Sequence, residues 1–213
     1  LTVIHYWSTM ARIIDKEEKR CDIALSAINL FCEKGIQQTS IDEIAKSAGV
    51  AKGTIYLYFK NKEEIVFAIW DVIAGRHREA FAKRVRADMS AKEKILEFYN
   101  FTECEEEQNK EQVLMLYQHF VSSMLIDKTG LYTAYFESFF QEDYDFIMNA
   151  LNEGIARKEF CVDNIELLTT TIILLLKGVL IRAKANNMGF HEAQTSLINH
   201  ITYLLDIGTR KVS

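Results

Sequence analysis

Residues 39–59 read TSIDEIAKSAGVAKGTIYLYF, and this stretch decides the fold of the N-terminal part of the chain. Ser40 precedes apolar residues at helical spacing, and Glu43 follows it by three positions, which is the pattern of a reciprocal capping box. Gly49 can adopt the left-handed conformation that ends such a helix. The stretch therefore predicts a short helix from residue 41, a tight turn, and a second short helix from residue 51.

The second of these helices has two different faces. Ile55 and Phe59 are four residues apart and lie on the same side of it. The other sides offer a cation, hydroxyl groups and an apolar tip to DNA, and they carry Lys52, Gly53, Thr54, Tyr56 and Leu57. This spacing, over about residues 40–59, is that of a helix-turn-helix, in which the second helix enters the major groove. A surface helix pair in an ordinary bundle is the alternative that the spacing leaves open.

The sequence predicts that the rest of the chain is also helical. Its 213 residues include no proline and only nine glycines, which argues against a fold of many short strands. Helical spacing predicts one helix before the motif and six after it, over residues 15–34, 63–85, 91–108, 111–126, 131–157, 164–186 and 192–207. We therefore expect an all-α fold of about nine helices, with a head of residues 10–62 and a bundle of residues 63–213. Met10 reads as a natural initiator, so residues 1–9 are expected to be an added leader.

Charge and cysteine usage narrow the class of protein. The net charge is −5, but residues 10–62 hold nine Lys and Arg against seven Asp and Glu, a local balance of +2. The four cysteines form no C-x-x-C pair, so the sequence predicts neither a zinc ribbon nor a disulfide framework, and a reducing cytoplasm fits. The longest apolar stretch, residues 172–181, is broken by Lys177 and is half of what a membrane span needs, which is about 20 residues.

An enzyme is the competing class of function. The five histidines show no metal-binding spacing, and no glycine-rich phosphate-binding loop occurs. We therefore expect no catalytic residues, no metal and no cofactor. A helical protein-binding or structural bundle without DNA binding remains the alternative to a DNA-binding protein.

The amino-acid sequence of residues 39–45 and 48–64 closely resembles that of the TetR family of bacterial transcriptional regulators, and the resemblance extends from residue 17 to about residue 70. The resemblance implies that Thr39 and Ser40 approach a phosphate and that Lys52, Gly53 and Thr54 open the recognition helix. By the same resemblance, Lys52, Thr54 and Leu57 contact bases, whereas Tyr56, Tyr58 and Lys62 hold the phosphate backbone. Ala51 departs from the family pattern, which often has serine or threonine there, so the usual cap of this helix is missing.

Aromatic residues are concentrated in the middle of the chain. Twelve of the 49 residues from 98 to 146 are aromatic, which is half of the chain's total of 24. Such a concentration is typical of a core, but in the resembling family these helices enclose an effector cavity. The residues expected to line a pocket for a largely apolar or aromatic small molecule are Phe98, Phe101, Tyr117, His119, Phe120, Tyr135, Phe136, Phe139 and Phe140.

Residues 172–181 are apolar on all sides, a pattern that a surface helix keeps only when another body covers it. We expect a second copy of the chain to cover it, with a four-helix interface made by two stripes. The stripes consist of Leu167, Thr171, Leu174, Gly178 and Ile181 on one helix and of Leu197, Ile201 and Leu204 on the next.

The sequence as a whole predicts a ligand-responsive DNA-binding transcriptional regulator. The resemblance implies a cytoplasmic homodimer that binds a palindromic double-stranded DNA operator as a repressor and leaves it when a small-molecule effector binds. The helix of residues 63–85 joins the head to the bundle and is the expected transmitter.

Overall fold

A computed structural model describes residues 16–101 and 107–209, so residues 1–9, residues 10–15 of the expected head and residues 210–213 lie outside the described part. Residues 16–26 are helical. The helices that follow are α2 (Ile28–Lys34), α3 (Ile41–Ser47), α4 (Lys52–Tyr58), α5 (Lys62–Arg84), α6 (Ala91–Phe98), α7 (Glu107–Ile126), α8 (Leu131–Ala156), α9 (Ile165–Ala185) and α10 (Phe190–Gly208). The all-α prediction is confirmed.

The predicted helix-turn-helix is present as α3 and α4. The Ser40 hydroxyl accepts the Glu43 backbone N–H, and the Glu43 carboxylate accepts the Ser40 backbone N–H, which is the capping box expected from the sequence. Gly49 takes a φ of +66°, and the following Val50 N–H donates to the Ala45 carbonyl oxygen at 3.0 Å. Ala51 gives α4 no side-chain cap, as the sequence indicates.

The first predicted helix, over residues 15–34, is broken at Ala27. The Ser26 hydroxyl donates to the Ile23 carbonyl oxygen at 2.7 Å, and the Ala27 N–H donates to Ala24 rather than to Ile23. A serine that bonds back to its own helix competes with the backbone hydrogen bond, which explains the break. The chain continues almost at once as α2.

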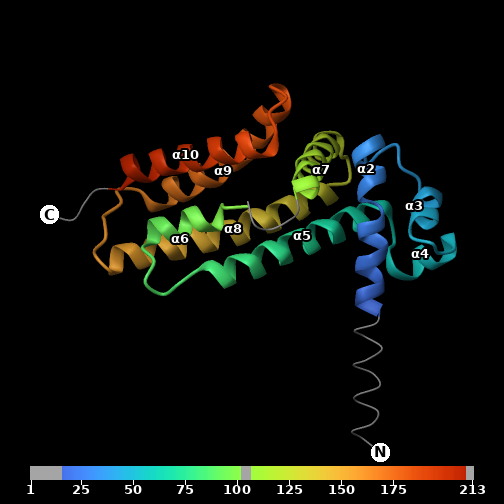
Figure 1. Cartoon of the computed structure of the whole chain (residues 1–213), viewed down its shortest axis with the longest axis horizontal. Helices are drawn as coiled ribbons and strands as arrows, with labels where there is room; N and C mark the ends of the chain where they lie inside the picture. The colour runs from blue at the N-terminus through green and yellow to red at the C-terminus, as the bar shows by residue number, and fades with distance from the viewer. Residues whose placement is uncertain (1–15, 102–106, 210–213) are drawn as a thin grey trace, which may run out of the picture.

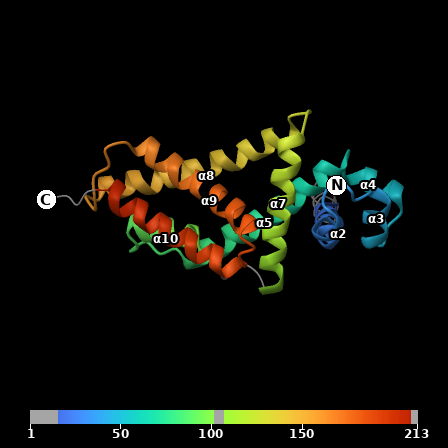
Figure 2. The same cartoon turned by 90° about the horizontal axis from the view of Figure 1, so that it is seen from above.

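The molecule is elongated, with the head at one end. Figure 1 shows α5 running from the head along the body beside α8, and α6, α9 and α10 completing the far part of the body. Figure 2 shows α7 crossing the long axis between the head and these helices. This position makes α7 a wall of the body and a support of the head at the same time.

Two hydrophobic clusters hold the chain together. The body cluster is built on α6, α8, α9 and α10, with Ile95, Leu151, Ile172 and Ile201 among its fully buried residues. The head cluster contains Ile23, Phe31, Ile44, Ile55, Phe59, Ile65, Ile69, Leu116, Phe120 and Tyr132, among others. Since the last three belong to α7 and α8, packing is continuous across the expected boundary at residues 62 and 63.

The helix predicted over residues 91–108 is shorter than expected, because α6 ends at Phe98. At this point the Gln194 side chain of α10 donates to the Tyr99 carbonyl oxygen at 2.8 Å and accepts the Phe101 N–H at 3.4 Å. Arg84 of α5 donates to the Asn100 carbonyl oxygen at 3.0 Å. These long-range partners satisfy backbone groups that a longer helix would have paired internally.

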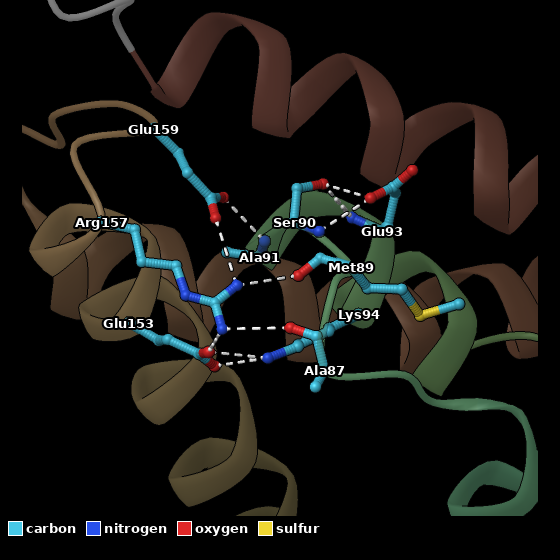
Figure 3. A network of polar contacts seen from close by, with 9 residues as sticks. All are labelled: Ala87, Met89, Ser90, Ala91, Glu93, Lys94, Glu153, Arg157 and Glu159. Carbon is cyan, nitrogen blue, oxygen red and sulfur yellow. Dashed lines mark hydrogen bonds and ion pairs between the residues drawn. The ribbon is translucent and has the colours of Figure 1, made fainter.

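Polar contacts close the end of the body farthest from the head (Figure 3). Arg157 at the end of α8 donates to the Met89 carbonyl oxygen at 3.1 Å and pairs with Glu153 at 2.5 Å. Glu159 accepts the Ala91 N–H at 2.8 Å, which satisfies a free donor in the first turn of α6. The contacts fix the α5–α6 connection against the end of α8.

Candidate nucleic-acid interface and ligand cavity

The outer face of α4 is free for a partner. Tyr56 and Leu57 are 54% and 72% exposed, whereas Ile55 and Phe59 are almost completely buried in the head cluster. Lys52 and Gly53 are also exposed, and Thr54 and Tyr58 are partly buried. The division between the two faces of α4 is therefore the one expected from the sequence.

Lys52 at the start of α4 has a partner within the head. Its Nζ atom lies 2.7 Å from an Asp42 carboxylate oxygen, and this hydrogen bond raises the pKa of Lys52. Both side chains remain exposed. A phosphate or a base edge can therefore take the place of Asp42 without any rearrangement of the backbone.

The expected phosphate contact of Thr39 is wrong. Thr39 is 2% exposed, and its hydroxyl donates to the Gly35 carbonyl oxygen at 2.9 Å. The residue closes the end of α2, where a carbonyl lacks a partner within the helix. Ser40, the next residue, is exposed at the start of α3.

Lys62 also has a structural role that differs from the expected one. Its Nζ atom donates to the carbonyl oxygens of Gln37 and Thr39 at 3.0 and 2.9 Å, and burial lowers its pKa. The side chain thus fixes the loop between α2 and α3 from the start of α5. The prediction that it serves as a point charge for the DNA backbone needs this correction.

A cavity of about 750 Å³ lies in the body between α5, α6, α7, α8, α9 and α10. Its walls are mostly apolar, with rings from five helices and from Tyr99 and Phe101 after α6. The expected pocket residues that line it are Phe98, Phe101, Tyr117, Phe120, Tyr135, Phe136 and Phe139. Its volume falls within the range of pockets that enclose drug-sized molecules.

Two of the expected pocket residues lie elsewhere. Phe140 packs against the body cluster and stacks near Tyr144, with ring centroids 6.4 Å apart. His119 points from α7 toward the head, where its Nε2 atom is 3.4 Å from the Cys32 carbonyl oxygen. Its ring also lies against Gly35, so closely that a Cβ atom there would be 3.3 Å from it.

An acidic and a basic side chain face each other at the cavity. Asp143 of α8 and Lys177 of α9 line it, with Oδ2 and Nζ 4.0 Å apart and side chains 17% and 16% exposed. Burial raises the pKa of Asp143 to about 6, against the opposing effect of Lys177, and burial lowers the pKa of Lys177. The Lys177 Nζ atom also lies 4.9 Å from the centre of the Phe136 ring.

The sequence analysis missed Asp143, although a signal was present. Asp143 follows Phe136 by seven residues and Phe139 by four, so it lies on the same face of α8 as these two rings. A single carboxylate within an aromatic stripe is costly to bury unless it has a function or a partner.

Two tyrosine hydroxyl groups are buried near this pair. The rings of Tyr99 and Tyr117 line the cavity, and within the described part of the chain their hydroxyl oxygens are buried without a hydrogen-bond partner. Burial raises the pKa of both tyrosines, and the charge of Asp143 raises it further.

The wall of the cavity formed by α7 also contacts the head. Tyr117 and Phe120 of α7 line the cavity. Gln112 of the same helix contacts α2, because its side chain donates a 2.8 Å hydrogen bond to the Asn29 side chain. Tyr135 of α8 makes a second connection, because its ring stacks on Phe67 of α5 at 4.2 Å and its hydroxyl donates to the Phe67 carbonyl oxygen at 2.9 Å. Two contacts therefore join helices that wall the cavity to the head.

One face of α9 is apolar and exposed. Leu167, Leu174 and Ile181 are 54–63% exposed, and Gly178 lies open between them. The expected positions of Leu197 and Ile201 in a stripe on α10 are wrong, because both residues are buried in the body cluster of the same chain. The exposed apolar residues of α10 are instead Tyr203 and Ile207.

No helix in residues 16–101 or 107–209 is long and apolar enough to cross a membrane. Within the same residues, no group of three or more His, Cys, Asp or Glu side chains could hold a metal ion.

Comparisons with known proteins agree with this architecture. Residues 23–69 match the model of the family described as bacterial regulatory proteins, tetR family. A fatty acid metabolism regulator protein of Bacillus subtilis is 40% identical over 80 residues, which cover 38% of this chain and 41% of that protein. The chain thus aligns with about two fifths of the length of this relative.

Solved structures match over most of the chain at low identity. A TetR transcription regulator from Haloarcula marismortui superposes with a TM-score of 0.75 at 15% identity, over 92% of this chain and 99% of that one. The regulator FadR from Bacillus subtilis, solved in complex with stearoyl-CoA, has a TM-score of 0.63 at 22% identity, over 84% and 96% of the two chains. These likenesses establish the fold, and the head, over residues 23–69, is similar to the tetR family of bacterial regulatory proteins.

Proposed function

We propose that this protein is a ligand-responsive, DNA-binding transcriptional regulator, a cytoplasmic repressor that a largely apolar or aromatic small molecule releases from a palindromic operator. The observation that carries the proposal is the outer face of α4, exposed from Lys52 to Leu57 while Ile55 anchors the helix inside the head. Regulators of this family are not enzymes.

DNA binding would use the head in a defined division of roles. Lys52, Thr54 and Leu57 present a cation, a hydroxyl and an apolar group at the start of α4, the part of a recognition helix that reaches base edges. Ser40, Gly53, Tyr56 and Tyr58 are the residues proposed to lie against the phosphate backbone. Lys62 supports this surface by holding the loop before α3 rather than by touching DNA.

A second copy of the chain would cover α9 and α10. The exposed positions Leu167, Leu174, Gly178 and Ile181 form one stripe, with Thr171 between them, and Tyr203 and Ile207 extend it onto α10. Leu204 is partly buried and adjoins this surface. Two heads related by a twofold axis would read a palindromic operator.

Release would follow from a change in the spacing of the two heads. A ligand shifts an equilibrium only by its differential affinity for the two states, so it must fit the cavity better in the state that does not fit DNA. The contacts of α7 with α2, and of Tyr135 with Phe67, supply a route in addition to α5 itself.

The proposal is tested by selecting bound fragments from a random duplex library and measuring their affinity by fluorescence anisotropy at several salt concentrations. We expect enrichment of a palindrome and an affinity that falls steeply with salt, by a logarithmic slope of about 0.9 for each neutralised phosphate. Thr54→Ala should relax the selected sequence, whereas Lys62→Met should weaken all duplexes alike and lower the melting temperature. Absence of any retained duplex would favour a helical bundle without DNA binding.

Effector classes can be compared in the same assay. Stearoyl-CoA, the ligand named for FadR, and 2-naphthol represent an acyl and an aromatic apolar molecule. The aromatic walls of the cavity support the second class. We expect 2-naphthol to release the selected duplex, and release by polar sugars alone would contradict an apolar effector.

A further inference from the structure

We propose that the effector is an electrically neutral molecule whose hydroxyl group binds between Lys177 and Asp143, with its apolar part among the aromatic rings of the cavity. This inference rests on the proposed function, because it defines the ligand of the same cavity. It starts from the polar groups that the apolar walls leave without hydrogen bonds.

Asp143 and Lys177 are mostly buried, yet neither makes a hydrogen bond within the described part of the chain. Their charged atoms are 4.0 Å apart, which is longer than a hydrogen bond. Buried ionised groups normally satisfy most of their donors and acceptors. Both side chains line the cavity, so a molecule bound there can supply the missing partner.

The 4.0 Å separation suits a hydroxyl group. An oxygen atom about 2.8 Å from each charged atom, the usual length of a charge-assisted hydrogen bond, completes a triangle with the observed pair. In that position the oxygen accepts a hydrogen bond from the Lys177 ammonium group, and the hydroxyl donates a hydrogen bond to the Asp143 carboxylate. A group that only donates or only accepts leaves one of the two partners unsatisfied.

The charge balance of the pair favours a neutral ligand. The carboxylate and the ammonium group already cancel each other, so a ligand with a charge of its own would leave one unpaired charge in an apolar cavity. Burial of an unpaired charge is far more costly than burial of a hydrogen-bonded hydroxyl group. The other charged residues of the wall are two of each sign, namely Arg78, Lys110, Glu142 and Asp145. Arg78 pairs with Glu142 at 2.8 Å, and Asp145 accepts a hydrogen bond from Gln141 at 2.8 Å.

Tyr117 gives the ligand oxygen a further contact. Its hydroxyl oxygen is buried without a partner, and its ring lines the same cavity as Asp143. Tyr135 lines the same cavity, but its hydroxyl already donates to Phe67 and Asp71 at 2.9 and 2.8 Å. Tyr117 and Tyr135 therefore form a matched pair for a test.

The test compares four probes that share one bicyclic skeleton: 2-naphthol, naphthalene, 2-naphthoate and 2-naphthylmethylammonium. Dissociation constants of the full-length protein are measured by calorimetry without DNA, so failure of DNA binding is recorded separately. We expect 2-naphthol to bind about tenfold or more tightly than each of the other three, which corresponds to at least one hydrogen bond. Tighter binding of the carboxylate or the amine, or no binding of any probe, would overturn the proposal.

Variants assign the effect to named side chains. The double variant Asp143→Asn with Lys177→Met avoids an unpaired buried charge and should remove the advantage of 2-naphthol over naphthalene. Tyr117→Phe should reduce that advantage severalfold, and Tyr135→Phe should leave it unchanged. An advantage that survives in the double variant would refute the proposed binding site, even if every variant still binds both probes.

Discussion

Two lysines of the head have partners within the chain itself. Lys52 points to Asp42 before any DNA is present, and Lys62 is fully engaged with the loop before α3. The two lysines look equivalent in the sequence, but their side chains therefore differ in how readily they can bind a new partner. Lys52 can change its partner at the surface, whereas Lys62 cannot leave Gln37 and Thr39 without loosening the head.

Asp42→Asn should raise the affinity for DNA severalfold on operator and random duplexes alike. The substitution frees Lys52 and removes a negative charge beside the proposed phosphate contacts. Anisotropy titrations at low and high salt measure the effect, which should shrink as salt rises. Asp88→Asn, at an exposed position far along the chain, is the control, and an equal gain there would show that only net charge matters.

His77 should make the protein sensitive to acid. Burial lowers its pKa from 6.5 to about 4, opposed by a hydrogen bond to Phe98. The unfolded chain then binds more protons than the folded one between these values, so stability is present above about pH 6.5 and is lost as the pH falls toward 4. The loss is up to about 3 kcal/mol.

Urea unfolding of the protein and of His77→Phe at pH 4.5 and 7 measures this contribution of His77. The difference between the two proteins should change in favour of His77→Phe at the lower pH. Asp143 has an opposite effect on stability, since its raised pKa lowers stability as the pH rises toward 6, but it is present in both proteins and cancels. An unchanged difference would contradict the effect of burial on His77.

At the scale of helices, the sequence predicts those helix starts and ends that depend on interactions between neighbouring residues. The capping box of Ser40 and the turn at Gly49 lie within a few residues of each other, and both are found. The end of α6 depends on Gln194, almost a hundred residues away in the chain, and no local pattern could reveal it. For the same reason, helical spacing located the apolar residues of α10 but did not show that Leu197 faces the body of its own chain.

Gly154 and Gly178 form a matched pair of helical glycines. A Cβ atom at Gly154 would lie 2.4 Å from a ring carbon of Phe160 and 2.8 Å from the Cβ of Ala91, whereas nothing lies within 4 Å of one at Gly178. Gly154→Ala should therefore lower the free energy of unfolding by about 2 kcal/mol.

In a single chain, Gly178→Ala should stabilise α9 by about 0.5–1 kcal/mol because alanine favours helices. If two chains pack closely at this point, the same substitution should instead weaken the dimer. Chemical unfolding at several protein concentrations separates the two effects. Equal destabilisation by both substitutions at low concentration would contradict the open environment of Gly178.

At the scale of the whole molecule, the exposed apolar face of α9 is the feature that a single chain does not explain. The sequence predicted its position from residues 172–181, because a helix without a polar face cannot be covered by its own chain on all sides. It could not identify the cavity pair of Asp143 and Lys177, since their meeting depends on how α8 and α9 cross.

Leu174→Glu should convert a dimer into a monomer and reduce operator affinity by at least about tenfold, because the two heads then bind independently. Sedimentation velocity at micromolar concentration and anisotropy on the selected duplex measure the two outcomes. Leu125→Glu is the control, since Leu125 is 77% exposed on α7. A monomeric parent protein, or an equal effect of both substitutions, would contradict the proposed interface.

The hydrophobic cluster of the head ends in Leu116, Phe120 and Tyr132, which the chain supplies more than 50 residues after the motif. A chimeric protein that joins this head to the body of another protein must therefore keep α5 and must have surfaces on α7 and α8 that complement the head. A boundary at residue 62 would separate the head from Ile65 and Ile69, which are buried in its hydrophobic cluster, and the transferred head would lose these packing partners. A replacement of the ligand-binding part that leaves the head intact must therefore keep the contacts of Leu116, Phe120 and Tyr132 with the head cluster.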